Sequence, residues 1–280
     1  MEDDIIKAED NYILNAGDNP TLATELVNQA LSTVAQEEAE EVELKLPSDT
    51  TVDLPGGYIT LEGEVIRTAE VRELNGKDEE LISKASSVGK MLNTIVSRGT
   101  VSIGGHPAND AMLDRMFAGD RDALLIGIYK ATFGNPAELQ AWCNGCDAFK
   151  TIALDLDADI SSRVLASPME DREFTVEGRG KEYTVILPTG STQKELNSST
   201  DKTLAELTTI LLQSCVIAID GTPVYNKNMV GNIGLQDRRK IAEEISKRVP
   251  GPKFEDITVT CPDCDNEVVV PINIGDLFRF

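Results

Sequence analysis

Two Cys-x-x-Cys pairs constrain the fold of this 280-residue chain more than any other feature. The first pair is Cys143 and Cys146, and the second is Cys261 and Cys264. Each cysteine of the second pair lies 118 positions after its counterpart, since 261 minus 143 and 264 minus 146 give the same number. A predicted strand follows each pair. The equal offset indicates a tandem duplication in which each copy contributes one cysteine pair to a shared site.

Other features upstream of the cysteines repeat in the same order. Each copy is predicted to contain a Leu-Pro-x-Gly turn, an extended stretch, a helix, a strand, a glycine turn, further helices, and a strand that leads to the cysteine pair. The matched stretches are Leu54–Gly57 with Leu187–Gly190, Val101–Pro107 with Ile217–Pro223, and Asp120–Arg121 with Asp237–Arg238. Such a long repeat predicts two fused domains or two halves of one pseudo-symmetric domain, because solenoid repeats are much shorter.

The helix that precedes the glycine turn has the clearest sequence signals. In the first copy, Asn75 is a predicted N-cap and Asp78 occupies the acidic position of a capping box. Apolar residues at helical spacing continue this pattern up to Gly99. Its predicted apolar face consists of Leu81, Ile82, Ala85, Val88, Leu92 and Ile95, and that of the second copy consists of Leu204, Leu207, Ile210 and Leu211.

We therefore expect an α+β fold of two tandem helical and strand copies, joined by a four-cysteine site that resembles a zinc ribbon. Residues 1–43 are predicted to form an N-terminal helical arm that ends in an acidic linker. Residues 44–165 are the predicted first copy, and residues 166–280 are the second. Both copies are long enough to bury a hydrophobic core.

The formal net charge of -22 limits the partners of this chain. Nucleic-acid-binding proteins need basic stripes to neutralise phosphates, and this sequence contains none of any length. The same sign disfavours anionic membrane surfaces, and no apolar run reaches the length of a membrane span. The acidic start of the sequence lacks the pattern of a signal peptide, so we expect a reducing cytoplasm.

In a reducing compartment, paired cysteines favour a metal or redox role over structural disulfides. Zinc prefers four thiolates in a tetrahedron, and each Cys-x-x-Cys turn supplies two, so Cys143, Cys146, Cys261 and Cys264 are expected to bind one structural zinc. The long separation between the pairs leaves two alternatives open: reduced cysteines without metal, and a disulfide or redox role. Iron in four thiolates would give the same pattern.

Catalysis is not expected. His106 is the only histidine, and the motifs of phosphate-binding loops are absent. Carboxylates are abundant without an outstanding pair, so a carboxylate-based hydrolase is kept only as an alternative. Trp142, directly before Cys143, is predicted to pack on the neighbouring strand.

Two segments resemble proteins of contractile-tailed phages. The closing segment, Val259–Arg279, is similar to the carboxyl-terminal signature of baseplate-hub and hub-assembly-chaperone proteins of T-even-type phages. The stretch Glu70–Glu80 resembles the opening of phage tail proteins. Asp147 and Asp265 depart from the family pattern, which usually has glycine after the second cysteine.

The resemblance implies a non-catalytic structural role in the tail baseplate of the virion, with assembly in the host cytoplasm. Other tail and baseplate proteins would be its partners, without nucleic acid or membrane, and a homo-oligomer within the baseplate stays open. The alternative is a transient hub-assembly chaperone that is absent from the mature virion.

Overall fold

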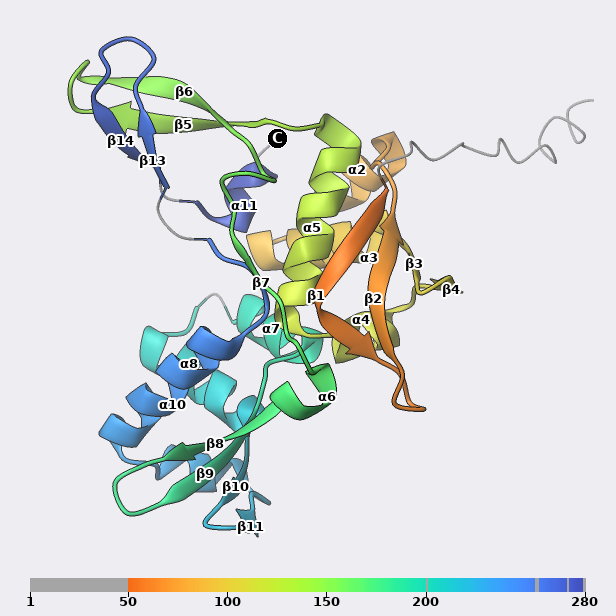
Figure 1. Cartoon of the computed structure of the whole chain (residues 1–280), viewed down its shortest axis with the longest axis vertical. Coiled ribbons are helices and arrows are strands. Elements are labelled where there is room, and N and C mark those ends of the chain that lie inside the picture. The colour runs from red at the N-terminus through yellow and green to blue at the C-terminus, as the bar shows by residue number, and fades with distance from the viewer. Residues whose placement is uncertain (1–49, 200, 255–256, 271, 279–280) are drawn as a thin grey trace, which may run out of the picture. The chain divides into compact units, whose positions relative to one another are not determined.

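The computed structural model of the chain describes residues 50–199, 201–254, 257–270 and 272–278. It is a mixed α+β structure with several small antiparallel sheets, which confirms the α+β part of the predicted fold (Figure 1). The N-terminal arm predicted over residues 1–43 lies outside the described residues. Within the described part of the chain, no helix has the length and apolar character needed to cross a membrane.

A four-stranded antiparallel sheet and four helices make up most of the N-terminal half, defined here as residues 50–165. The strands are β1 (Thr51–Ile59), β2 (Val65–Val71), β3 (Thr100–Ile103) and β4 (His106–Pro107), and the helices are α2 (Gly76–Ile82), α3 (Val88–Gly99), α4 (Asp110–Arg115) and α5 (Ala118–Phe133). The strands lie in the order β1-β2-β3-β4. Helix α5 packs on β1 and β2, so the sheet buries its apolar face against this helix.

The start of α2 confirms the predicted capping box. The side chain of Asn75 accepts hydrogen bonds from the backbone of the first turn, and Asp78 accepts one from the Asn75 N–H. The single long helix predicted from Leu81 to Ile95 was wrong, because residues 83–87 separate α2 from α3. Ser87 caps α3 by accepting a hydrogen bond from the Lys90 N–H, and serine favours such caps over helix interiors.

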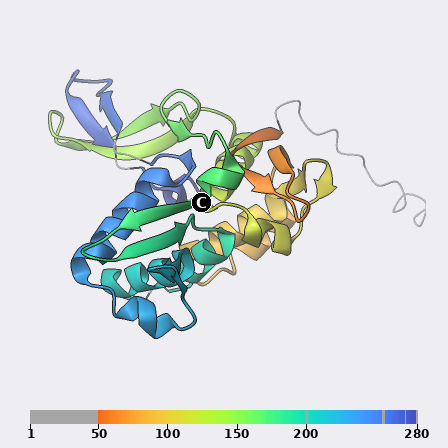
Figure 2. The same ribbon diagram turned by 60° about the horizontal axis from the view of Figure 1, so that its bottom comes forward.

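The C-terminal half, residues 166–278, contains a second four-stranded antiparallel sheet. Its strands are β8 (Glu173–Glu177), β9 (Glu182–Ile186), β10 (Val216–Ile219) and β11 (Thr222–Pro223), and its helices are α6 (Pro168–Asp171), α7 (Gly190–Asn197), α8 (Leu204–Cys215), α9 (Lys227–Gly231) and α10 (Leu235–Arg248). The strand order is again the chain order, β8-β9-β10-β11. Helices α8 and α10 lie beside this sheet (Figure 2).

Two hairpins carry the cysteine pairs. They are formed by β5 (Ala137–Cys143) with β6 (Ala148–Leu154), and by β13 (Ile257–Thr260) with β14 (Glu267–Val270). Strand β14 contacts β5, so the hairpins lie side by side although more than a hundred residues separate them in sequence (Figure 1). The remaining elements are β7 (Ser162–Arg163), β12 (Gly251–Pro252) and α11 (Ile274–Leu277).

The two largest hydrophobic cores do not follow the order of the sequence. One core contains residues of β1 to β6 together with Cys261, Val268 and Phe278 from the end of the chain. The other consists of residues from β8 to α10, among them Tyr183 and Ile241. The closing segment therefore packs on the N-terminal half, and this return of the chain brings the second cysteine pair to the first.

The halves also meet at the start of α5. Gly119 lies so close to the backbone of Pro250 that a Cβ atom at this position would overlap the Pro250 carbonyl oxygen. One turn away, the Gln193 side chain on α7 donates a hydrogen bond of 2.7 Å to Asp122 on α5. The close backbone approach requires glycine at position 119.

Candidate metal centre

The first cysteine pair lies at the tip of the β5–β6 hairpin. Residues of β5 alternate between buried and exposed, and Cys143 lies on the buried side at the end of the strand. Cys146 follows in the turn and is partly buried. Asp147 then takes a φ of 52°, a left-handed conformation that reverses the chain into β6.

The second pair has the same backbone arrangement. Cys261 is buried directly after β13, and Cys264 is partly buried in the turn. The Cys261 N–H donates to the Asn266 carbonyl oxygen at 2.8 Å, and the Asp265 N–H donates to the Cys261 carbonyl oxygen at 3.1 Å. Asp265 has a φ of 57°. Each pair is thus held in a tight turn that directs both sulfur atoms to one side.

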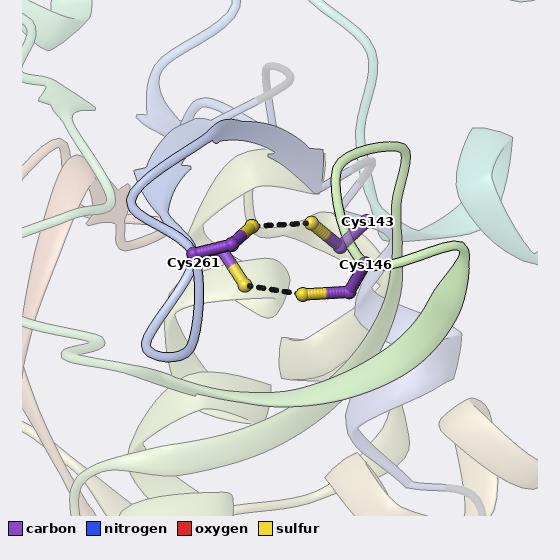
Figure 3. A group of neighbouring side chains, drawn as sticks. Cys143, Cys146 and Cys261 are labelled. Atoms are coloured by element: carbon purple, nitrogen blue, oxygen red, sulfur yellow. Dashed lines mark hydrogen bonds between the residues drawn. The ribbon is translucent and has the colours of Figure 1, made fainter.

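The four sulfur atoms face one another across the two turns (Figure 3). Cys143 Sγ lies 3.5 Å from Cys264 Sγ, and Cys146 Sγ lies 3.8 Å from Cys261 Sγ. All four lie within 4.8 Å of one another, and none is in a disulfide. A sulfur–sulfur bond measures about 2.0 Å, so these separations correspond to free thiols or to ligands of a common ion.

This geometry fits a metal ion with four thiolate ligands. Zinc–sulfur bonds of about 2.3 Å in a tetrahedron place the sulfur atoms about 3.8 Å apart, close to the two shortest separations here. Four protein ligands leave no open position for water or substrate, which is typical of a structural site. Iron accepts the same four thiolates, so the donor set alone does not identify the ion.

Comparison with known families identifies the group to which the chain belongs. Residues 39–279 match the family model described as T4 bacteriophage base plate protein. The chain belongs to this baseplate family. The searches of curated proteins and of solved structures found no match to the chain. Membership implies a place in the virion tail and contacts with other phage tail proteins, and it confirms the family that the closing segment indicated.

Asp147 and Asp265 of this baseplate protein occupy positions where the family resemblance leads one to expect glycine. Both residues have a positive φ, the region in which glycine avoids the steric cost of a Cβ atom. Aspartate is one of the few other residues that enter this region at moderate cost. The turns therefore keep the backbone shape that glycine favours, although the side chain differs.

The environment of the thiols shifts their pKa values in opposite directions. Backbone N–H groups of Asp263 and Cys264 stabilise the Cys261 thiolate, and they lower the pKa of this thiol to about 7 against the effect of burial. A hydrogen bond with Cys264 and burial raise the pKa of Cys146 to about 12. Several thiolates cannot gather here unless a cation offsets their charge, so metal binding would release protons.

Three supporting residues around the cluster were not predicted from the sequence. A Cβ atom at Gly145 would clash with the Asn266 side chain and approach Cys264 Sγ to 2.9 Å, so only glycine fits between the two turns. Lys150 on β6 forms an ion pair with Asp263 of the other turn. Gly145 and Asp263 lie inside the Cys-x-x-Cys pairs, but the sequence does not show what they contact, because their partners belong to the opposite hairpin.

Three residues outside the four cysteines take no part in the cluster. Cys215 ends α8 and is buried in the core of the C-terminal half. His106 is exposed in the short strand β4. Trp142 contacts Phe149 on the neighbouring strand, as predicted, but it lies on the exposed face of the hairpin and does not cover the sulfur atoms.

Proposed function

We propose that this protein is a non-catalytic structural component of the tail baseplate that acts through contacts with other tail proteins. Family membership points to the baseplate, and the four-cysteine cluster supports a structural role there. The cluster fits a closed metal site that joins two hairpins and leaves no open coordination position for a substrate. The site would lock the hairpins into one rigid surface. A carboxylate-based hydrolase is disfavoured by this assignment.

Cys143, Cys146, Cys261 and Cys264 are the proposed ligands of one shared ion, for which zinc is our first choice. The sulfur separations and the burial of Cys143 and Cys261 support this assignment. The ion would supply a cross-link between segments far apart in sequence, and its binding energy would add to folding stability. Iron is the alternative ion.

We also infer that the two halves arose by tandem duplication. Both contain a four-stranded antiparallel sheet in chain order, with two helices between the second and third strands. Each half repeats one backbone-to-carboxylate hydrogen bond at the start of its last long helix. The Gly56 N–H donates to Asp120 Oδ1 at 2.6 Å, and the Arg179 N–H donates to Asp237 Oδ1 at 2.9 Å.

The next residue of each helix supports the same inference. Arg121 donates a hydrogen bond of 2.7 Å to Asn93 on α3, and Arg238 donates one of 2.7 Å to Thr209 on α8. Helices α3 and α8 occupy equivalent places in the two halves. On this basis residues 44–165 and 166–280 remain our proposed copies, preceded by residues 1–43.

The strong negative charge supports a role in which the protein meets basic patches on neighbouring tail subunits. Opposite charges speed encounter and set the register of binding more than they add affinity. The transient chaperone is the second candidate, because the family resemblance includes hub-assembly chaperones. Purified particles distinguish the two roles, since a structural component stays in the virion and a chaperone does not.

The metal content of the purified chain tests the site. We expect one zinc per chain by elemental mass spectrometry, and loss of the metal together with thermal stability in Cys261→Ser. Cys215→Ser is the matched control, since Cys215 is a buried cysteine outside the cluster. Freshly purified, reduced protein without metal would contradict the proposed site.

A further inference from the structure

Two exposed aromatic rings lie beside the cysteine cluster on the β5–β6 hairpin. Trp142 and Phe149 are directly opposite each other in the strand register, and their rings meet edge to face with centroids 5.1 Å apart. Trp142 is 45% exposed and Phe149 is 68% exposed. Trp142 is also the only tryptophan of the chain. Exposed aromatic rings contribute little to folding stability, and their apolar area is buried only if another surface covers them.

The strand alternation fixes which way the pair faces. Cys143 and its partner Ala148 lie next along the hairpin and belong to the opposite, inner face. On the aromatic face, the next pair is Gln140 and Thr151, joined by a hydrogen bond of 2.7 Å. An apolar centre with polar neighbours is the usual composition of a protein interface.

The charge of the hairpins restricts the partner. Residues 137–154 and 257–270 contain five carboxylates and one lysine, Lys150. This lysine is paired with Asp263, whereas Glu138 and Asp147 on the aromatic hairpin form no ion pair among the described residues. The rings therefore lie in a negatively charged surrounding. A complementary surface is apolar at its centre and basic at its rim.

We propose that the Trp142–Phe149 face is the surface by which this chain docks into an apolar pocket, bordered by lysine or arginine, on a different tail protein. The proposal rests on the baseplate function above and names the surface involved. An ion held by the four cysteines would fix the turn between Cys143 and Cys146, and thereby also the strands that carry both rings. Rigid aromatic side chains lose little freedom on binding, which is why tryptophan is enriched among the residues that dominate interfaces.

A second copy of the chain is a poorer occupant of this face. Two identical hairpins would bring the same unpaired carboxylates together, and like charges in contact oppose association. Anionic membranes and nucleic acids are disfavoured for the same reason.

A photo-cross-linker in place of Phe149 tests the proposal directly in cells that assemble tails. p-Benzoylphenylalanine at position 149 of the full chain is expected to cross-link to another tail protein, at apolar residues with lysine or arginine nearby. Tyr225 provides the matched control, because it is an aromatic residue 81% exposed outside the hairpins. The same probe at position 225 should not reach that pocket. A cross-link from position 149 to a second copy, or none in assembled tails, overturns the proposal.

The double variant Trp142→Ser, Phe149→Ser supplies an independent measurement. We expect unchanged metal content and at least about tenfold lower incorporation into tails, since residues at the centre of an interface often have effects of this size. If tails require the metal-binding cysteines but accept this variant at wild-type levels, only the docking surface is refuted. If purified tails that carry the wild-type protein do not contain this chain, the structural baseplate function itself fails. The photo-cross-linking result decides the matter if the double variant does not fold.

Discussion

Asp120 makes the stability of the protein depend on pH in a direction opposite to that of most carboxylates. Its side chain is fully buried at the start of α5, where Oδ1 accepts a hydrogen bond from the Gly56 N–H and Oδ2 has no hydrogen-bond partner among the residues that the structure describes. Burial raises the pKa of Asp120 from 3.8 to about 7, although the Gly56 hydrogen bond acts in the other direction. The folded protein therefore holds a proton at mildly acidic pH that the unfolded chain has already released.

The sign and size of the effect follow from this difference. Between about pH 4 and the folded pKa, the native state binds more protons than the unfolded state, so the free energy of unfolding falls as the pH rises. Each unit of pKa difference corresponds to about 1.4 kcal/mol, and a difference of about three units gives a loss on the order of 4 kcal/mol above neutral pH. The full stabilisation is present only at acidic pH.

Urea unfolding of Asp120→Asn, followed by circular dichroism from about pH 5 to 8.5, tests this reasoning. Asparagine keeps the acceptor for the Gly56 N–H and has no charge. The stability advantage of the variant over the wild type should grow by about 3 kcal/mol from the acidic to the basic end, because about two pH units separate pH 5 from the folded pKa of Asp120. If the variant loses stability over this range as steeply as the wild type, the burial argument is refuted.

Asp237, at the equivalent place in the C-terminal half, is the matched control. It accepts hydrogen bonds from the Arg179 N–H and the Tyr183 hydroxyl, which lower its pKa. Asp237→Asn should therefore destabilise the protein at neutral pH and leave the slope between about pH 5 and 8 unchanged.

Three further substitutions test other features. Burial would raise the pKa of Asp78, but hydrogen bonds from Arg72 and Arg98 outweigh it and lower the pKa to about 2. The contribution of Asp78 to folding stability is therefore complete above the ordinary pKa of 3.8 and is lost as the pH falls through about 2. Asp78→Asn should cost about 3 kcal/mol in urea unfolding at neutral pH and little in strong acid. Asp265→Gly should raise stability by about 1 kcal/mol in thermal unfolding with unchanged metal content, whereas Asp265→Ala, which keeps the backbone strain, should give no gain. Gly119→Ala should destabilise by about 3 kcal/mol or more in the same measurement, and a similar effect from Gly76→Ala, which has open space, would argue against the close contact.

The sequence predicted the site better than the surroundings of the site. The equal spacing of the cysteine pairs and the affinity of thiolates for a common ion were enough to expect that Cys143 and Cys261 lie together, and the four sulfur atoms do lie together. Gly145 and the Lys150–Asp263 ion pair escaped prediction, because their partners belong to the other hairpin. Contacts of this kind depend on tertiary structure and leave no local pattern.

The helices show the same limit. Apolar spacing from Leu81 to Ile95 suggested one helix, but a break before Ser87 separates two, and Leu81 and Val88 are exposed at its edges. The spacing of apolar residues indicates which segments can form an amphipathic helix. It does not show where a capping residue ends one helix and starts another. Similarly, Trp142 was correctly expected to pack on the neighbouring strand, where it contacts Phe149. Its exposure to solvent could not be predicted, because it depends on which face of the hairpin points outward.

The return of the chain end to the first hydrophobic core has a consequence for biosynthesis. Residues 50–165 emerge from the ribosome well before Cys261, Val268 and Phe278, which complete their core. Until then, the nascent protein exposes an unfinished apolar surface and two unpaired thiols, and long-range contacts of this kind form slowly. The C-terminal half can close its own core during this interval. Residues 257–278, which are synthesised later, therefore finish the part of the protein that was made earlier.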